Sequence, residues 1–355
     1  MKIFIPQNSF SKPLQMDLPE KGVVGIFGET GVGKTTFLKF LTGLLKMEGA
    51  ELIFQNQIWQ RKNFFLPPWK RSLGYVSQDS QVFSQKTGQE NLQFALRYRS
   101  SALKNSSNPL EKIVESAKDF RLESFLHLKP EKFSGGQRQR LALAQALIAE
   151  PKLILLDEPM SAQDIAEKER LSKLCKEKNQ KMQSLIFYVT HSLDEFLQMA
   201  DHGLWFVKNN PIDCFSGPLP ALWPKMAQQL GVLAQFFITQ VQQIQGSQAK
   251  VPLFGDDFWV YAPNAKVGKE IRVFIEAKKW WVGEKFFEGG SSGYFNAVKA
   301  EFTGWQRFKN ELFSRWKAKE NLWLIPMLEK KEQEKKLTLG EGYFCYCSKQ
   351  VKVFV

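Results

Sequence analysis

The stretch that decides the fold is Gly28-Glu29-Thr30-Gly31-Val32-Gly33-Lys34-Thr35-Thr36. It has the pattern G-x-x-x-x-G-K-[ST] of the P-loop, a glycine-rich turn that binds phosphate. The apolar run 22–27 (GVVGIF) predicts a buried strand before it, and Phe37, Leu38 and Leu41 follow at helical spacing. The sequence therefore predicts a phosphate site between a strand and the N-terminus of a helix.

The residues of this loop have the chemistry that a nucleoside triphosphate needs. Glycines allow a tight turn whose backbone N–H groups converge on phosphate oxygens, and the helix dipole adds positive potential. We expect Lys34 to reach the β- and γ-phosphates of ATP and the Thr35 hydroxyl to bind Mg²⁺. An ordinary glycine turn before a helix is the alternative, and the complete eight-position pattern argues against it.

The composition is that of a globular protein without a membrane span. The chain has 355 residues, 43% hydrophobic and 24% charged, which predicts two or three domains. It contains no run of about 18 apolar residues, and residues 1–13 lack the apolar core of a signal peptide. Four cysteines fit a reducing compartment, and we interpret Cys345 and Cys347 as packing residues rather than metal ligands.

The net charge of +13 predicts an anionic partner. Nucleic acid and an anionic membrane surface both fit this charge. The lysines and arginines are scattered, and no stretch reads as a basic nucleic-acid-binding arm. We therefore expect a protein that works beside anionic lipid, and no nucleic acid partner.

Three further predicted strands are followed by polar residues. These are 73–77 followed by Gln78, 152–156 followed by Asp157 and Glu158, and 184–190 followed by His191. Ligands bind at the carboxyl edge of a parallel sheet, so we expect these side chains to lie near the P-loop.

Each of these side chains has a predicted role at that edge. Asp157 would reach Mg²⁺, through water, and Glu158 would polarise the attacking water. His191 would hydrogen-bond the γ-phosphate and orient the water, and the Gln78 amide would touch the metal or the water. Solvated acids at a strand end, a capping or core histidine and a surface glutamine are the alternatives.

Two other features are assigned to the nucleotide site. Ser134-Gly135-Gly136-Gln137 precedes the helical run 141–148 and offers a hydroxyl and free N–H groups at a positive helix end, which would serve another nucleotide. Phe10 lies in a predicted turn before the P-loop, where its ring would either stack on adenine or simply pack.

The order of these motifs resembles the ATP-binding cassette (ABC) transporter ATPases over about residues 1–215. By this resemblance Gln78 looks like the Q-loop residue, 133–137 like the signature, 161–164 like the D-loop and His191 like the switch histidine. Gln163 departs from the leucine that is usual in the D-loop. The resemblance implies a homodimer that binds two ATP, each P-loop facing the signature of the other subunit.

The second half of the chain changes to short predicted strands. Residues 226–248 are interpreted as a linker helix and 249–355 as an all-β domain, similar to the OB-like domain that ends many importer ATPases. With the segment 69–79, this arrangement resembles the ATP-binding subunit of bacterial molybdate importers, whose C-terminal domain is of the molybdate-binding Mop type. That motif is matched only in part, with Asn296 and Lys299 as candidate oxyanion donors or else turn and surface residues.

The predicted fold is α/β, with an ABC domain over 1–225 that has a parallel-sheet core and a helical subdomain at about 79–140. We expect an ATPase at the cytoplasmic face of the bacterial inner membrane. Its expected partners are permease subunits and, indirectly, a periplasmic oxyanion-binding protein. Sulfate, tungstate, iron or polyamine are alternative cargoes, and a non-transport ABC protein acting on ribosomes or nucleic acid is an alternative of another class.

Overall fold

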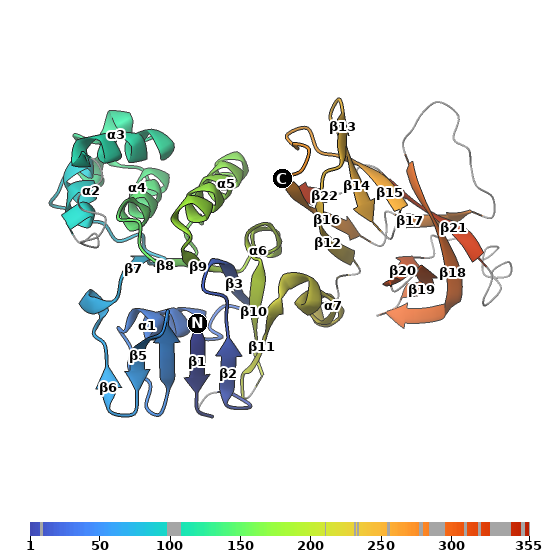
Figure 1. The fold of residues 1–355 in the computed structure, drawn as a ribbon, viewed down its shortest axis with the longest axis horizontal. Coiled ribbons are helices and arrows are strands. Elements are labelled where there is room, and N and C mark those ends of the chain that lie inside the picture. The colour runs from blue at the N-terminus through green and yellow to red at the C-terminus, as the bar shows by residue number, and fades with distance from the viewer. Residues whose placement is uncertain are drawn as a thin grey trace. The chain divides into compact units, whose positions relative to one another are not determined.

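The computed structural model divides the chain into two compact units, Met1–Leu219 and Pro220–Val355. Figure 1 labels their helices and strands. The residues that it describes are 1–7, 10–97, 108–209, 211–230, 232, 234–253, 256–276, 280–283, 295–308, 311–318, 321–326, 342–348 and 352–354.

The first unit begins with a five-stranded antiparallel sheet of order β2-β1-β4-β5-β6. Its strands are β1 (Lys2–Ile5), β2 (Leu14–Asp17), β4 (Glu51–Phe54), β5 (Gln57–Arg61) and β6 (Phe64–Phe65). Buried and exposed residues alternate along β2, as expected of a sheet with one face on the core. The hairpin between β4 and β5 turns at Gln55 and Asn56, both at positive φ.

The second sheet has the order β11-β10-β3-β9-β8-β7. Its strands are β3 (Gly22–Gly28), β7 (Leu73–Val76), β8 (Leu153–Asp157), β9 (Leu185–Thr190), β10 (His202–Val207) and β11 (Asp213–Pro218). All neighbours are parallel except β11, which runs antiparallel to β10. Every residue of β8 and β9 is buried, because layers cover both faces of the sheet.

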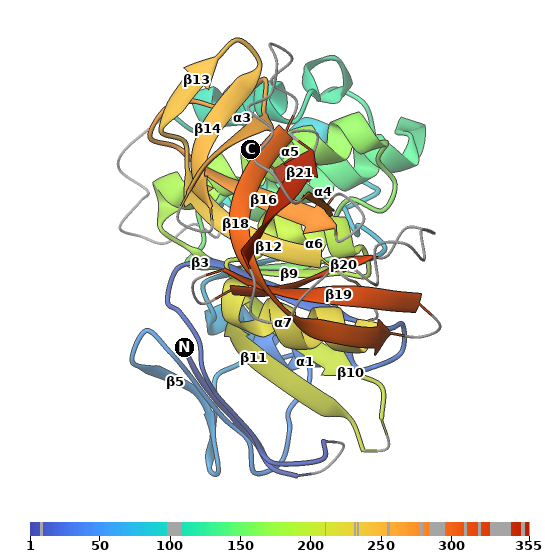
Figure 2. The same cartoon turned by 90° about the vertical axis from the view of Figure 1, so that its right-hand side faces the viewer.

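Helices and the antiparallel sheet form these covering layers. Their bounds are α1 (Lys34–Thr42), α2 (Gly88–Arg97), α3 (Pro109–Asp119), α4 (Gly135–Ile148), α5 (Ile165–Met182) and α6 (Leu193–Met199), with 3-10 turns at Pro68–Lys70, Glu123–Phe125 and Pro130–Lys132. Figures 1 and 2 show α1 and the antiparallel sheet on one side of the parallel sheet, and α3, α4 and α5 on the other. Among the described residues, no helix is long and apolar enough to cross a membrane.

Two apolar cores follow from this layering. Phe37 and Phe40 of α1 pack with Phe187 and Phe206 between the two sheets. On the other face, residues of α4 such as Leu143 pack with Tyr188 of β9 and with the helical region. The same sheet therefore fixes the position of α1 from one side and of α4 from the other.

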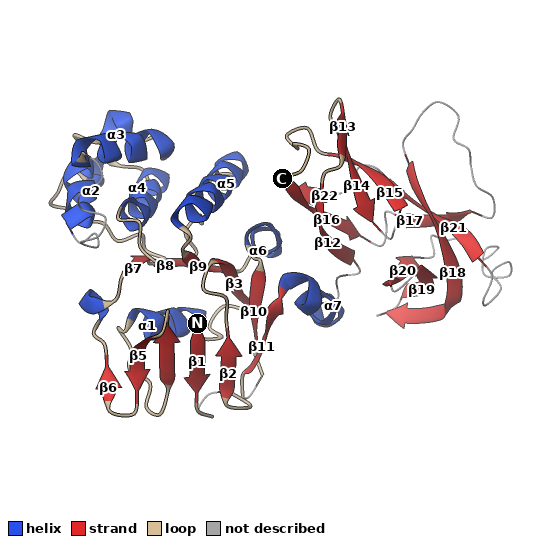
Figure 3. Cartoon of the chain, in the orientation of Figure 1, coloured by secondary structure: helices blue, strands red, loops and turns tan. Residues whose placement is uncertain are grey.

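After the helix α7 (Leu219–Leu230), the second unit is built from strands, as Figure 3 shows. Its strands are β12 (Ala234–Gln240), β13 (Gln243–Gln245), β14 (Gln248–Leu253), β15 (Asp256–Tyr261), β16 (Glu270–Glu276), β17 (Trp280–Gly283), β18 (Phe295–Phe308), β19 (Glu311–Ala318), β20 (Asn321–Pro326), β21 (Gly342–Ser348) and β22 (Lys352–Phe354). Over its described residues they form three sheets, β12-β16-β22, β13-β14-β15 and β17-β21-β18-β19-β20. The predicted all-β class is confirmed.

The linker helix predicted over 226–248 is wrong in its extent. The helix α7 runs from Leu219 to Leu230, and β12 and β13 occupy most of the remaining range. Trp223 of α7 contacts Phe236 of β12 and Phe274 of β16, with ring centroids 6.3 and 5.5 Å apart. The chain thus turns from helix to strand at once, because the apolar residues after α7 join the core of the β unit.

Candidate functional site

The P-loop connects the carboxyl end of β3 to α1. Gly31 and Gly33 adopt φ values of 81° and 95°, in the left-handed region that glycine enters without strain. Gly33 is the N-cap of α1, and no side chain caps this end. The first N–H groups of the helix are therefore open to an anion, and the helix dipole favours negative charge there.

The side chain of Lys34 is hydrogen-bonded to the backbone of the P-loop. Its ammonium donates to the carbonyl oxygens of Gly28 and Glu29 at 2.7 and 2.8 Å, and the residue is 6% exposed. An ammonium has three donors, so one remains for a ligand. Burial lowers the pKa of Lys34, while the charges of Glu158 and Asp157 act in the opposite direction. The cation is thus held where the phosphate-binding turn needs it.

Asp157, at the end of β8, has a free oxygen beside the P-loop. The residue is 1% exposed, and its Oδ2 is buried without a hydrogen-bond partner in the described part of the chain. Burial raises its pKa, whereas a hydrogen bond with Thr35 and the charge of Lys34 lower it. A carboxylate oxygen next to a hydroxyl is a hard-oxygen pair that suits Mg²⁺.

These two residues fit a magnesium ion that keeps other ligands. No group of three or more His, Cys, Asp and Glu side chains that could hold a metal occurs among the residues described. Mg²⁺ in phosphate sites takes one or two protein ligands, with phosphate oxygens and water completing the octahedron. The observed pair is therefore sufficient for a metal that arrives with a nucleotide.

Glu158 and His191 lie together at the same edge. The His191 Nδ1 is 3.2 Å from the Glu158 Oε1, and their side chains are 64% and 17% exposed. Glu158 has a φ of 48°, uncommon for a residue with a side chain and frequent at functional sites. Its N–H donates to the carbonyl of Val189 in β9 at 3.1 Å. The turn after β8 therefore brings the carboxylate to the histidine that follows β9.

A second carboxylate, Glu195, supports the His191 segment and was not predicted. It accepts hydrogen bonds from the Tyr188 hydroxyl at 3.0 Å and the Thr190 hydroxyl at 2.9 Å, and pairs with Lys168 of α5 at 2.9 Å. Ser192 caps α6 by accepting from the Glu195 N–H. The Ser-x-x-Glu spacing of a capping box was the signal in the sequence that marked this glutamate.

Gln78 lies in an exposed turn after β7, next to β8 in the sheet. It therefore shares the carboxyl edge with Asp157. The segment behind it is held by Asn91 of α2, a residue not predicted to matter. The Asn91 amide donates to the carbonyls of Phe83, Lys86 and Thr87 at 3.1, 3.2 and 2.9 Å, and its oxygen accepts from the Phe83 N–H.

The signature end of α4 differs from the prediction of free N–H groups. Ser134 is the N-cap, and its hydroxyl accepts from the Gln137 N–H at 3.2 Å. The Gln137 side chain accepts from the Ser134 N–H at 2.8 Å. Over the described residues, no hydrogen bond or ion pair joins 134–137 to 28–36. One chain thus brings together the P-loop, Asp157, Glu158 and His191, whereas its signature makes no described bond to its own P-loop.

Phe10 packs on the core beside the P-loop helix. Its ring centroid is 6.0 Å from that of Phe206, which in turn lies 5.7 Å from Phe37 of α1. A bridge to Ile212 fixes its backbone. The ring therefore packs on the core while remaining partly exposed, and stacking on adenine stays a prediction.

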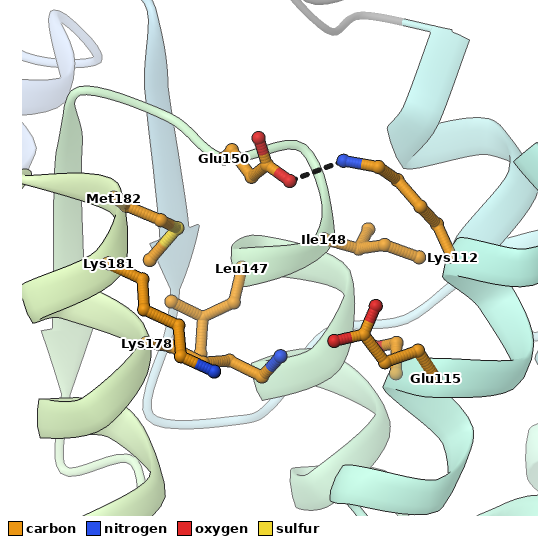
Figure 4. Close-up of a pocket in the computed structure, with 9 residues that line it drawn as sticks. Lys112, Glu115, Leu147, Ile148, Glu150, Lys178, Lys181 and Met182 are labelled. Carbon is orange, nitrogen blue, oxygen red and sulfur yellow. Dashed lines mark hydrogen bonds and ion pairs between the residues drawn. The ribbon is translucent and has the colours of Figure 1, made fainter. Parts of the chain in front are cut away.

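A pocket of about 220 Å³ lies at the other end of the helical layer (Figure 4). Residues of α3 and of the C-terminal ends of α4 and α5 line it, with an ion pair between Lys112 and Glu150 at its rim. α4 has 14 residues, which puts its two ends about 20 Å apart. The pocket is therefore separate from the signature, which lies at the N-terminal end of α4.

Comparison with known proteins agrees with this geometry. The ABC transporter family matches residues 11–161. A molybdenum import ATP-binding protein of Hahella chejuensis is 30% identical over 280 residues, 78% of this chain and 76% of the relative. The chain belongs to the ABC transporter family. As an ABC protein with this domain and these relatives, it is an ATPase.

Other relatives extend the match beyond the ABC domain. The molybdenum import ATP-binding protein of Methylococcus capsulatus is 29% identical over 276 residues, 76% of this ABC chain and 75% of the relative. The dimeric bacterial ABC cassette MJ0796 superposes with a TM-score of 0.54 at 23% identity, over 62% of this chain and 99% of the cassette. The structural likeness confirms the predicted α/β fold class.

Proposed function

We propose that the chain is the ATP-hydrolysing subunit of an importer, with molybdate as cargo, and that it works at the cytoplasmic face of the inner membrane with permease subunits. The observation that carries the ATPase site is the contact of Glu158 with His191 at the sheet edge that also holds Lys34 and Asp157. The cargo rests on relatives that are molybdenum import ATP-binding proteins.

The P-loop binds the phosphates of ATP in this proposal. The open N–H groups of residues 28–36 receive the phosphate oxygens, and the third donor of Lys34 reaches the β- and γ-phosphates. Thr35 and Asp157 hold Mg²⁺, the latter through water, and Gln78 adds an amide oxygen from the neighbouring strand end. The ion neutralises charge on the β- and γ-phosphates when it is bound.

Glu158 and His191 act on the water. The Glu158 carboxylate takes up a proton from the water whose oxygen attacks the γ-phosphorus in line, so that the new P–O bond forms while the bond to the bridging oxygen breaks and ADP leaves. His191 hydrogen-bonds the γ-phosphate oxygen and keeps water and phosphate aligned. Their 3.2 Å contact supports these roles, because both groups already share one position at the sheet edge.

The site is completed by a second copy of the chain. Ser134, Gly135, Gly136 and Gln137 lie at a helix end that carries positive potential and is separate from the P-loop of the same chain. In a twofold dimer this end faces the γ-phosphate bound by the partner subunit. The dimeric state of the cassette MJ0796 supports this arrangement.

The remaining predicted residues are assigned to binding and coupling. The ring of Phe10, partly buried against Phe206, offers its open side to adenine. Gln78 and the helices up to α4 transmit the nucleotide state to the permease, which receives cargo from a periplasmic oxyanion-binding protein. The net charge of +13 suits a surface beside anionic lipid.

The C-terminal unit is proposed as a regulatory domain. The side chains of Asn296 and Lys299, its candidate oxyanion donors, lie outside the described side chains. Sulfate, one of the alternative cargoes, is tested beside molybdate. In the assembled transporter, molybdate should stimulate ATP turnover more than sulfate; equal stimulation by both would contradict the cargo assignment.

Glu158→Gln tests the reaction. In the chain reconstituted with its membrane subunits, the variant should bind ATP and lose turnover by at least about a hundredfold, because the amide cannot take up a proton. Glu169→Gln, an exposed glutamate of α5, is the matched control. Unchanged ATP turnover in Glu158→Gln would contradict the proposed role of Glu158 in hydrolysis.

A further inference from the structure

The loop that follows Glu158 is tied to the signature end of α4 by two glutamine side chains. This tie involves Gln139, which is 2% exposed, and Gln163, which is partly buried. The motifs predict neither contact, because the two glutamines are 24 residues apart in the chain.

Gln139 is hydrogen-bonded to this loop through both its amide nitrogen and its amide oxygen. Its Nε2 donates to the Glu158 carbonyl at 3.4 Å and to the Ser161 hydroxyl at 3.2 Å. Its Oε1 accepts from the Ala162 N–H at 3.1 Å. The turn that sets the backbone of Glu158 is thereby attached to a buried side chain of α4.

Gln163, in the loop itself, makes hydrogen bonds back to α4. Its Nε2 donates to the Gly136 carbonyl at 2.8 Å and to the Gln139 Oε1 at 3.2 Å. Gly136 has no side chain in the way: a Cβ there would stand 3.2 Å from the Gln163 amide and 3.3 Å from the Ala162 carbonyl. The amide therefore lies directly on the signature glycine.

We infer that Gln163 is a positioning residue: its amide fixes the loop after Glu158 onto the signature end of the same chain. This inference rests on the proposed function, in which Glu158 serves the ATP on its own P-loop and the signature serves the ATP of the partner subunit. Gln163 then links the two ATP sites within one chain, so that the catalytic glutamate of one and the signature of the other keep a fixed relation.

Gln163→Glu is the sharpest change, because it keeps the shape and removes both donors. A carboxylate would face the Gly136 carbonyl and the Gln139 Oε1, which are both acceptors. Gln139 cannot turn its amide to donate without taking the acceptor from the Ala162 N–H. Gln163→Leu removes the donors without adding charge. Gln180→Glu, an exposed residue of α5, carries the same added charge as a control.

The first test is amide hydrogen exchange of the full chain without nucleotide. Gln163→Glu should exchange at least about fivefold faster than wild type both at 135–138 and at 161–163, because the bonds from Gln163 to Gly136 and Gln139 are replaced by repulsion between acceptors, and only the bonds of Gln139 still join the two segments. Gln180→Glu should exchange like wild type. Unchanged exchange at either segment in Gln163→Glu would overturn the inference.

The second test is ATPase kinetics in the assembled transporter. Gln163→Glu should lower kcat at least about fivefold and leave KM for ATP within about twofold, because misplacement of the glutamate and signature affects the transition state while the P-loop still binds ATP. Gln163→Leu should fall between it and wild type. A kcat equal to that of Gln180→Glu overturns the inference but not the proposed function, which depends on wild type and Glu158→Gln.

Discussion

The N-terminal ends of α1 and α4 both contain glycine and carry positive potential, but they differ in their side-chain capping. α1 begins at Gly33 with no side-chain cap, and Lys34 lies inside the turn. α4 begins at Ser134, whose hydroxyl and whose N–H are both bonded to Gln137. The uncapped start of α1 can bind an anion within one chain. The start of α4 is already stabilised by its own capping bonds, and in the proposed dimer its ligand is the ATP bound by the partner subunit.

The two helices are also held in place by different chemistry. The buried Arg71 donates to the carbonyls of Phe40 and Leu41 at the end of α1, at 3.1 and 2.7 Å, and burial lowers its pKa to about 10. α4 is held through Arg140, which pairs with Glu167 of α5 at 3.1 Å. Carbonyl oxygens do not titrate below neutral pH and a carboxylate does, so acid should weaken only the support of α4.

The largest effect is expected at the open helix start. Lys34→Met removes the cation of the P-loop, and ATP turnover should fall by about a thousandfold or more because charge on the phosphates is no longer stabilised. Lys39→Met, an exposed lysine of the same helix, should keep turnover near that of wild type. Phosphate release by the assembled transporter measures both. Equal losses in the two variants would contradict the special role of the open start.

The ion-pair support of α4 predicts a pH dependence. Hydrogen bonds from Arg170, and further ones from Arg140, lower the pKa of Glu167 from 4.5 to about 2. A depressed carboxyl pKa stabilises the fold above the unfolded pKa, and this stability is lost as the pH falls from 4.5 towards 2. Between pH 6 and pH 3 the loss should be about 2 kcal/mol.

Glu167→Gln provides the reference for this prediction. Urea unfolding of wild type and variant at both pH values gives the difference, since all other titrating groups are common to the two proteins. The variant should be less stable at pH 6, and the gap should narrow at pH 3. A gap that does not change with pH would mean that the carboxylate is not what holds α4.

The smallest effect is expected at the self-capped start. Ser134→Ala removes an N-cap hydroxyl and should cost about 1 kcal/mol of stability. The ATP affinity of the isolated chain should stay at the wild-type value, because the P-loop is on another helix. Fluorescence titration with a labelled ATP analogue, together with urea unfolding, measures both quantities. A loss of ATP affinity in the isolated chain would show that the two helix starts are not independent.

The same contrast explains what the sequence could predict. The P-loop, Asp157, Glu158 and His191 lie directly after strands, so local patterns located them and the parallel order β3-β9-β8 brought them together. The bonds of Gln139 and Gln163, and the ion pair of Glu195 with Lys168, join elements that are distant in sequence, and no periodicity carries that information. The capping box at Ser134 could be predicted from its Ser-x-x-Gln spacing, which indicates that the serine and glutamine bond to each other's N–H groups.

The strand β11 and the end of the predicted linker helix could not be predicted, because pairing with other strands decides their structure. β11 (DCFSGP) has the turn residues Ser-Gly-Pro within it, and it forms only because β10 offers an edge for pairing. The predicted linker helix continued past Leu230 because apolar residues at 234–238 fit both a helix and a strand, and tertiary pairing with β16 decides for the strand.

The central claim is that each P-loop is completed by the signature of a second chain, and sedimentation of the Glu158→Gln chain tests it most directly. With ATP and Mg²⁺ the mass should double, because bound ATP persists between two chains. The added substitution Gly135→Asp should prevent doubling while each chain still binds ATP, because the Cβ it introduces has room in its own chain: outside the local helix, the nearest atom among the described residues is the Ala162 Cβ at 3.9 Å. A Glu158→Gln chain that stays monomeric with ATP, or a doubled mass in the Gly135→Asp chain, would contradict the account.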